Sequence, residues 1–519
     1  MKLDKSKNTK RNIIYGIINK TVTLLLPFLI RSIIIYFLSA EYLGINSLFS
    51  SIIQVLNLTE LGFSSAIVYS MYKPVAENDE ETICALLNFY RKAYFIIGCV
   101  VLVIGLSLLP FLDKLINGDY PSGLNIRIIY LFYLINTVLS YMLFAYKNSI
   151  LNAYQRTDIL SNVNTITLSG MYLVQIVILT ITKNFYLFVV MMPFFTLLNN
   201  IIIAVISKRM YPQYVCKGKV SKDLLSGMKK QVSGLMVTKL CAVTRNSFDS
   251  IFVSAFLGLT TTAMYGNYYY IMNAIIGVLM VVSNSMLAGV GNSIVTDSVE
   301  KNYKDLQKIN FIYMWIAGWC TICLLCLYQP FMKIWVGEEL MFSIPVMISF
   351  CIYFYALEMG VVRGVYSDAA GLWWENRYRA IAEAIANIIL NYCLVQFMDV
   401  MGIIIATLIS LLIINFGLGS QIVFKYYFKN KKLHEYFLCH VKYFLVTAFI
   451  SIITYLIIGT VTVDGILGLL IKAFICVILP NILYILIYRR NDMYKSSVSW
   501  ILSVFHLNKL CKLFGVDNS

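Results

Sequence analysis

Long apolar segments dominate the sequence, and each is long enough to cross a lipid bilayer. Runs of about 18 or more predominantly apolar residues predict about fourteen membrane-spanning helices. The predicted spans lie near residues 12–38, 42–72, 89–112, 124–146, 158–182, 185–207, 231–258, 262–290, 309–328, 341–366, 373–397, 401–427, 437–459 and 466–488. Charged types make up only 13% of the 519 residues, where a soluble domain would carry about 25%. We therefore predict an all-α, polytopic membrane protein.

Lysine and arginine residues are concentrated in alternate connections between the predicted spans. Roughly 30 of them lie on the side shared by both termini, and roughly three, Lys114, Lys183 and Lys333, lie on the opposite side. Because short cytoplasmic loops carry an excess of basic residues, both termini are predicted to be cytoplasmic. The same topology accounts for the net charge of +16, so we do not expect nucleic acid as a partner. The first span is too long for a cleaved signal peptide and is expected to stay in the protein.

A basic segment, residues 208–230, divides the predicted spans into two similar halves. It holds seven lysines and arginines, and we interpret it as a cytoplasmic linker lying on the anionic inner leaflet. Residues 1–207 are then a six-helix N-terminal lobe and residues 231–427 a six-helix C-terminal lobe. Residues 428–519 add spans thirteen and fourteen and a cytoplasmic tail.

Short sequence matches recur at equivalent positions of the two halves. Because both halves also enter the membrane from the cytoplasm, these matches predict a pseudo-symmetric repeat of parallel orientation. The matches pair Gly44 with Gly266, Asn88 and Phe89 with Asn310 and Phe311, and Pro110 and Phe111 with Pro330 and Phe331.

The cysteines and histidines do not match a catalytic or metal-binding pattern. Cys320, Cys323 and Cys326 are spaced by three, but they lie in one predicted span without a nearby histidine, so we expect them to pack in the membrane. The three histidines lie in basic connecting or tail segments. The predicted external connections are too short to hold a catalytic domain. We therefore predict no cofactor, no metal and no enzymatic activity.

Several short stretches carry a resemblance to a known family. In the first half they are EYLGI at 41–45, ELGFSSA at 60–66 and YKP at 72–74, and in the second half DSIFV at 249–253, LG at 257–258 and YGNY at 265–268. Together they resemble bacterial polysaccharide-transport flippases. These O-antigen and capsule repeat-unit translocases belong to the multidrug/oligosaccharidyl-lipid/polysaccharide exporter superfamily.

The resemblance implies a two-lobed transporter in the bacterial cytoplasmic membrane, with a cavity that opens alternately to each side. Its cargo would be an undecaprenyl-diphosphate-linked oligosaccharide moved from the inner to the outer leaflet. Further partners would be membrane lipids and, from the same pathway, a polysaccharide polymerase and glycosyltransferases. The chain has no G-x-x-x-x-G-K-[ST] phosphate loop, so transport driven by a proton or sodium gradient, or facilitated flipping, is the consistent mechanism.

Four basic residues inside spans one and seven are candidates for binding the diphosphate. Lys20 and Arg31 are eleven residues apart, so they share one face of a helix about 16 Å apart along its axis. Lys239 and Arg245 lie on the seventh span, which the repeat makes equivalent to the first. Arginine matches a phosphate with its planar fork. Snorkelling towards the membrane interfaces is the alternative role, especially for Lys20 and Arg31.

Three acidic residues inside spans are candidates for coupling transport to an ion gradient. Asp249 lies one helical turn after Arg245, so the two are predicted either to form a structural ion pair or to separate when substrate phosphate competes for the arginine. Glu60 and Glu358 are the other candidates. Glu358 precedes Arg363 by five residues, a spacing that does not suit a helical pair, so each is expected to find a partner elsewhere.

Uncharged polar residues also occur inside the predicted spans. We expect most of them to bond neighbouring helices, and we leave hydrogen bonding to sugar hydroxyls open for the others. They include Gln54, Asn57, Asn136, Asn164, Gln175, Asn273, Asn284, Asn387 and Asn391.

Two alternatives to the flippase hypothesis stay open. A cation-coupled multidrug exporter or a lipid II flippase belongs to the same superfamily, but multidrug exporters usually have twelve spans. A membrane-embedded polysaccharide polymerase is a different class and is disfavoured by the short external connections. The two additional spans and the basic residues in spans one and seven favour an anionic lipid cargo.

Overall fold

The computed structural model describes residues 5–57, 63–118, 120–429 and 433–504, and these residues form helices and connections. By their internal contacts they divide into two compact units, Met1–Ala263 and Met264–Ser519. The long helix α9 (Lys222–Thr296) contributes to both units. The predicted lobe boundaries were drawn from a sequence repeat, and they stay a prediction.

The described helices account for a multi-pass membrane protein. Ten helical segments are long and apolar enough to cross a bilayer, and a pair bent by 46°, Ile126–Met142 and Ala145–Ala153, adds an eleventh. Two of the ten, Val243–Thr296 and Trp373–Tyr426, each hold two predicted spans. The predicted second span corresponds to α2 (Ala40–Leu56) and α3 (Phe63–Glu77), and residues 58–62 between them lie outside the described part. The helix count is thus consistent with about fourteen spans.

Two backbone breaks separate spans that the secondary structure otherwise joins. At Gly258 the backbone adopts φ 84° and ψ 177° inside α9, a conformation that glycine reaches without a side-chain clash. At Asp399, inside α13 (Trp373–Ile409), φ is 49° and ψ is −133°. Both breaks fall at the ends of predicted spans, near residues 258 and 397. A stretch of π-helix, η5 (Ser410–Leu418), follows α13 and leads into α14 (Gly419–Tyr426).

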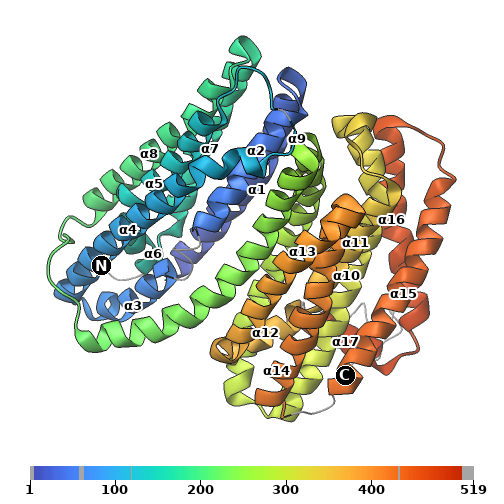
Figure 1. The fold of residues 1–519 in the computed structure, drawn as a ribbon. Coiled ribbons are helices and arrows are strands. Elements are labelled where there is room, and N and C mark those ends of the chain that lie inside the picture. Colours follow the sequence, from blue (N-terminus) through green and yellow to red (C-terminus); the bar gives the residue numbers. More distant parts are fainter. Residues whose placement is uncertain (1–4, 58–62, 119, 430–432, 505–519) are drawn as a thin grey trace. The chain divides into compact units, whose positions relative to one another are not determined.

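In the N-terminal unit, the first helix packs lengthwise on a later one (Figure 1). This unit holds α1 (Lys5–Phe37), α4 (Glu80–Leu108), η2 (Leu109–Leu115), α5 (Ile126–Met142), η3 (Ala145–Lys147), α6 (Asn148–Ala153), α7 (Thr157–Thr182) and α8 (Phe185–Met210). Helix α1 contacts α7, and α7 and α5 both contact α8. At the start of α7 the carboxylate of Asp158, which is 2% exposed, accepts bonds from Arg156 at 3.0 Å and pairs with Arg11 of α1 at 3.1 Å. This ionic contact joins the first turns of α1 to α7.

Close backbone contact holds α2 against the part of α9 around the break at Gly258. A Cβ atom on Gly44 would lie 2.2 Å from the carbonyl oxygen of Leu259, so a larger residue does not fit there. The Asn117 amide donates a hydrogen bond to the carbonyl of Ser254 at 3.0 Å, which ties the loop after η2 to the turn before Gly258. Two of the stretches that carry the family resemblance, around Gly44 and around Gly258, therefore meet in space.

In the C-terminal unit, α10 (Val299–Val336) is the central helix. The unit also contains η4 (Glu338–Leu340), α11 (Ile344–Met359), α12 (Val361–Ala369), α15 (Leu433–Gly459), α16 (Gly465–Tyr488) and α17 (Asp492–Val504). Helix α10 contacts α11, α15, α16 and α17 (Figure 1). A Cβ atom on Gly318 of α10 would lie 2.3 Å from the Tyr484 hydroxyl and 2.7 Å from Thr447 Oγ1, and those two hydroxyls are 2.8 Å apart. The last two spans are therefore an integral part of this unit.

Candidate functional site

The N-terminal unit contains an open polar pocket of about 500 Å³, which we call the N-terminal pocket. One face of α7 lines it through residues spaced three or four apart, and a similar face of α8 lies opposite. Helices α1, α4, α5 and α6 complete the wall. The lining residues are Asn19, Tyr90, Tyr94, Ser140, Tyr141, Ala145, Asn148, Asn152, Leu160, Ser161, Asn164, Thr167, Leu168, Met171, Phe195, Thr196, Asn199, Asn200 and Ile203. The volume lies within the range of about 300–1,000 Å³ that is usual for ligand pockets.

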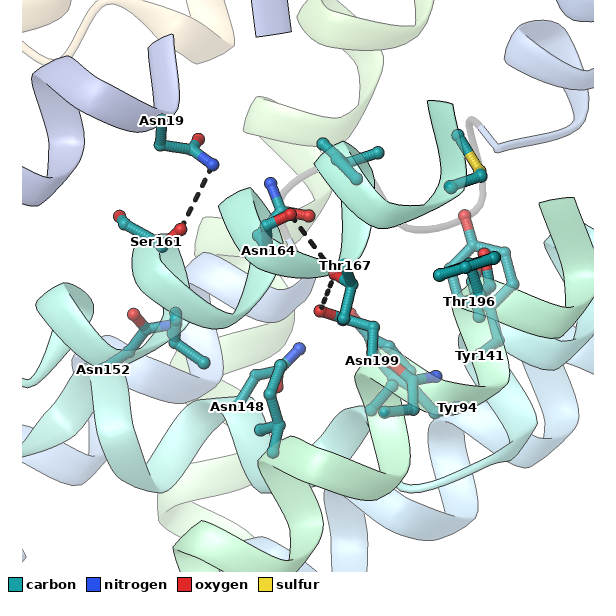
Figure 2. A pocket seen from close by; sticks show the side chains of 18 of the residues that line it. Asn19, Tyr94, Tyr141, Asn148, Asn152, Ser161, Asn164, Thr167, Thr196 and Asn199 are labelled. Atoms are coloured by element: carbon teal, nitrogen blue, oxygen red, sulfur yellow. Dashed lines mark hydrogen bonds between the residues drawn. The ribbon is translucent and has the colours of Figure 1, made fainter. Parts of the chain in front are cut away.

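A backbone break places α6 in the wall of this pocket. Phe144 adopts a left-handed conformation with φ 62°, which bends the chain by 46° after α5. The bend is followed by η3 and the short helix α6, in which Asn148 and Asn152 are one turn apart and therefore share a face. Figure 2 shows both carboxamides beside those of α7 and α8.

Some of the polar groups around the pocket are bonded to each other (Figure 2). The amide of Asn19 on α1 donates to the Ser161 carbonyl at 3.2 Å and to Thr165 Oγ1 at 3.0 Å. The Thr167 hydroxyl is 3.0 Å from Asn199 Oδ1 and also lies close to two carbonyls of its own helix. These bonds connect α1 to α7 and α7 to α8, and they hold the walls of the pocket in place.

Three carboxamides in the wall make no side-chain hydrogen bond with the described part of the chain. They belong to Asn148, Asn152 and Asn164, and Asn164 takes part only through its backbone carbonyl. Each carboxamide offers two donors and an acceptor. The three asparagines are half-buried beside the pocket, so these groups are available to water or to a bound polar molecule.

The lining defines what the pocket can do chemically. It contains no aspartate, glutamate, lysine, arginine, histidine or cysteine. Its serine, threonine and tyrosine hydroxyls therefore have no carboxylate or imidazole beside them in the lining that could act as a general base. Nor does any group of three or more metal-ligating side chains occur among the described residues. The pocket is suited to a neutral, polar molecule that both donates and accepts hydrogen bonds.

The predicted diphosphate-binding residues occupy different environments. Lys20 of α1 is exposed, and Arg31, three turns further along, is half-buried. Arg245 of α9 is 8% exposed. The side chain of Lys239 lies outside the described part of the chain. Their role in binding phosphate stays a prediction.

The predicted ion-coupling residues are buried where they are described. Asp249 of α9 is fully buried one turn from Arg245, and Glu358 of α11 is 1% exposed. The Tyr313 hydroxyl of α10 donates a hydrogen bond to the Glu358 carboxylate, so Glu358 finds its partner on another helix, as its spacing to Arg363 predicted. Glu60 lies outside the described residues. Coupling by any of them stays a prediction.

A second buried polar assembly, the C-terminal ion cluster, consists of Arg363, Arg379, Glu383 and Asn415. Glu383 of α13 accepts a bond from Arg379 at 2.6 Å and two from the Asn415 amide at 2.9 and 3.1 Å. Asn415, in the π-helix η5, also accepts a bond from Arg363 at 3.0 Å. The guanidinium of Arg363 fits because a Cβ atom at Gly419 would lie 1.9 Å from its Nη1. Neither Arg379 nor Glu383 was among the predicted site residues.

Most of the described polar residues inside the spans bond neighbouring helices, as expected. Gln175 Nε2 donates to the Phe188 carbonyl at 2.9 Å. Asn387 bonds Thr407 across the break in α13, whereas the bond from Asn391 to Asn387 lies within one helix. Asn57, Asn136 and Gln54 accept bonds from Tyr141, Thr196 and Ser247, respectively. Asn164 is different because its carboxamide faces the N-terminal pocket.

The comparisons with known proteins find similarity in structure rather than in sequence. No protein-family description matches the sequence, and no curated protein matches it significantly. An inward-facing multidrug resistance MATE family transporter of the MOP superfamily aligns with 79% of this chain and 97% of its own, with a TM-score of 0.59 and 15% identity. The lipid II flippase MurJ in an inward closed conformation aligns with 92% of this chain and 99% of its own, with a TM-score of 0.60 and 15% identity. The chain shares the fold of these transporters.

Another solved structure with this fold is a MOP superfamily transporter from Pyrococcus furiosus. It covers 80% of this chain and 94% of its own, with a TM-score of 0.52 and 16% identity. The helices of the described residues and the fold shared with these transporters confirm the predicted all-α membrane architecture.

Proposed function

We propose that this chain is a flippase that moves undecaprenyl-diphosphate-linked oligosaccharide repeat units from the inner to the outer leaflet of a bacterial cytoplasmic membrane. It would act by alternating access, with both termini in the cytoplasm. The transporter fold supports translocation as the general activity. The identity of the cargo is inferred from the features below.

The observation that carries the proposal is the helix pair α15 and α16. These helices pack on α10 through Gly318, Thr447 and Tyr484, so they belong to the architecture of the C-terminal unit. The alignment with the lipid II flippase reaches 92% of this chain, and the alignment with the inward-facing MATE transporter reaches 79%. A helical architecture that includes α15 and α16 favours a lipid-linked cargo over a small soluble drug.

The distribution of charge agrees with an anionic, glycosylated cargo. Lys20 and Arg31 on α1 and the buried Arg245 on α9 provide positive charge within the membrane for a diphosphate. The lining of the N-terminal pocket has no carboxylate that would attract a cationic drug. Flipping of lipid II is the second candidate, because the lipid II flippase aligns with most of this chain.

Reconstitution in liposomes tests the proposal. A fluorescent undecaprenyl-diphosphate disaccharide, a lipid II analogue and a lipophilic cation are supplied to the wild-type protein and to Arg31→Ala and Arg245→Ala. We expect flipping of the disaccharide by the wild type and its loss in both variants, because each removes a cation from a low-dielectric environment. Arg127→Ala, which changes an exposed arginine paired with Asp113, is the matched control. Export of the cation alone would contradict the proposal.

We propose ion coupling through Asp249, with Glu60 and Glu358 as the alternative carriers. An arriving diphosphate would compete for Arg245, and a carboxylate that loses its cation has a higher proton affinity. Flipping by Asp249→Asn is therefore expected to lose its response to imposed proton or sodium gradients while binding of the disaccharide is retained. An unchanged gradient response in the variant would move coupling to another residue, and no response in the wild type would indicate facilitated flipping.

A further inference from the structure

The N-terminal pocket holds unused hydrogen-bonding capacity on two of its helices. The carboxamides of Asn148 and Asn152 project from α6, and that of Asn164 projects from α7 (Figure 2). None of the three makes a side-chain hydrogen bond with the described residues, although neighbouring groups such as Thr167 and Asn199 are bonded to each other. The wall is therefore held in place by one set of bonds, while a second set of donors and acceptors is left for an occupant.

The same pocket combines these amides with aromatic rings. Tyr90, Tyr94, Tyr141 and Phe195 contribute to its lining, and Tyr90 and Tyr94 pack edge to face with ring centroids 4.3 Å apart. A pyranose ring presents hydroxyl groups at its edge and apolar C–H groups on its faces. Carboxamides that bond the hydroxyl groups at the edge, together with aromatic rings that contact the apolar faces, therefore complement a sugar. A lipophilic cation or a bare phosphate would require charges that the lining lacks.

The position of the pocket connects it to the residues predicted to bind the diphosphate. Asn19 lines the pocket, and Lys20 is the next residue on α1. Asn148 follows Lys147, which belongs to a connection predicted to be cytoplasmic. A glycan that is attached to a diphosphate on the inner leaflet would thus meet the amides of the pocket and Lys20, which follows the pocket residue Asn19 on α1.

We propose that the N-terminal pocket is a binding subsite for a neutral sugar residue, held by the carboxamides of Asn148, Asn152 and Asn164. That this sugar is part of the lipid-linked cargo rests on the proposed function. The subsite recognises hydroxyl and amide substituents by hydrogen bonding and leaves recognition of the diphosphate to cationic residues outside it.

Two binding measurements on the full-length protein in nanodiscs test the subsite. Saturation-transfer NMR reports binding of methyl glycosides of a hexose, a 6-deoxyhexose and an N-acetylhexosamine. Fluorescence competition gives the affinities for a short-chain prenyl diphosphate with and without one attached N-acetylhexosamine. The variants are the triple substitution Asn148→Leu, Asn152→Leu and Asn164→Leu, its three single components, and the control Asn162→Leu. Asn162 is an exposed residue of α7 that does not line the pocket.

We expect at least one methyl glycoside to bind the wild type and the control, and not the triple variant. The triple variant should bind the glycosylated prenyl diphosphate up to about tenfold more weakly than the wild type, because it loses several hydrogen bonds. It should bind the bare prenyl diphosphate as tightly as the wild type does. Should the triple variant not yield monodisperse protein, the single variants carry the test, each with a smaller loss confined to the glycosylated probes.

The outcomes separate the subsite from the proposed function. Equal losses for the glycosylated and bare prenyl diphosphates, or unchanged binding of every sugar probe in all the variants, would overturn the subsite. Binding of prenyl diphosphate to the wild type without any glycoside signal would overturn the subsite and leave the proposed function standing. Pocket-dependent binding of a glycoside without binding of either prenyl diphosphate would support the subsite and contradict the lipid-linked cargo.

Discussion

The N-terminal pocket and the C-terminal ion cluster use their polar side chains in different ways. The N-terminal pocket surrounds a cavity of about 500 Å³ with uncharged side chains and leaves three carboxamides without a side-chain hydrogen bond to the described residues. The C-terminal ion cluster contains charged groups, and its members bond one another across α12, α13 and the π-helix η5. Polar residues inside membrane helices thus have two distinct uses: three carboxamides of the N-terminal pocket are left for water or a ligand, and the members of the C-terminal ion cluster join helices.

This contrast has an energetic consequence. A carboxamide that faces a wet cavity contributes little to folding, because its hydrogen bonds with water are available in either state. A buried charge whose partner is removed is strongly unfavourable, because the low dielectric leaves it uncompensated. Measurements of stability therefore distinguish the two uses.

Removing the carboxylate of the C-terminal ion cluster should destabilise the protein most. Glu383→Leu leaves the buried Arg379 and the Asn415 amide without their acceptor, and we expect a loss of about 3–5 kcal/mol in the free energy of unfolding. Equilibrium unfolding in SDS measures the change. The double variant Arg379→Leu/Glu383→Leu should recover part of the loss, and Glu338→Gln, in an exposed ion pair, should leave stability unchanged. A Glu383→Leu variant as stable as the wild type would contradict the contrast between the units.

Filling the space beside Arg363 should have an intermediate effect. The added methyl of Gly419→Ala would lie 1.9 Å from Nη1 of Arg363, so the guanidinium has to move away from Asn415. We expect a loss of about 1–3 kcal/mol, typical of overpacking. Gly364→Ala on α12 is the matched control, because nothing lies within 4 Å of its added methyl. Thermal unfolding followed by size-exclusion chromatography compares Gly419→Ala with Gly364→Ala. Equal stability of the two variants would show that the Arg363 guanidinium can move without loss of its contacts.

Removing one free carboxamide from the N-terminal pocket should barely affect stability. Asn148→Leu is expected to change the free energy of unfolding by no more than about 0.5 kcal/mol, because its side chain bonds none of the described residues. The same SDS titration measures this variant beside Glu383→Leu. A loss comparable to that of Glu383→Leu would show that Asn148 has a structural role and would remove the distinction between the two units.

The smallest expected effect concerns the caps of two helices that the repeat makes equivalent. Asp79 Oδ1 accepts a bond from the Thr82 amide at 2.9 Å at the start of α4, and Ser298 Oγ accepts one from the Lys301 amide at 3.3 Å at the start of α10. Hydrogen bonds from Thr82 hold the pKa of Asp79 below its ordinary value. The contribution of this cap is therefore present above the unfolded-state pKa and is lost as the pH falls through the lower folded-state pKa.

Hydrogen exchange of the first turns of α4 and α10 tests this difference. Acidification should reduce protection at Thr82 relative to Lys301, because the cap at Ser298 does not titrate. Asp79→Ser should make the first turn of α4 respond to pH as α10 does. Equal responses of the two helices in the wild type would show that the ionisation of Asp79 does not contribute to the cap.

Several features of the fold were predictable because they depend on local composition. The breaks at Gly258 and Asp399 fall where predicted spans end, since a long apolar run interrupted by a few residues has to turn near the membrane surface. Glu358 was expected to find a partner off its own helix, and it bonds Tyr313. The Arg379–Glu383 pair was missed, although both residues lie in the predicted span 373–397 at i, i+4 spacing.

The N-terminal pocket could not be predicted from local sequence patterns. Asn148 and Asn152 lie just beyond the predicted fourth span, in a stretch read as a connection. The turn that carries them inward is centred on Phe144, which adopts a left-handed conformation although residues 143–147 contain neither glycine nor proline. Asn164 was recognised as a polar residue inside a span, but not as a pocket residue.

The sequence by itself determined that this chain is helical, spans a membrane many times and carries its basic residues in alternate connections. Those properties depend on the average composition of neighbouring residues, because the burial of an apolar run in lipid depends on its length and composition. Only the tertiary structure decided which polar residues bond each other and which line a cavity. That outcome depends on distances between helices far apart in the chain, and a shift of a few ångströms separates a satisfied hydrogen bond from an open one.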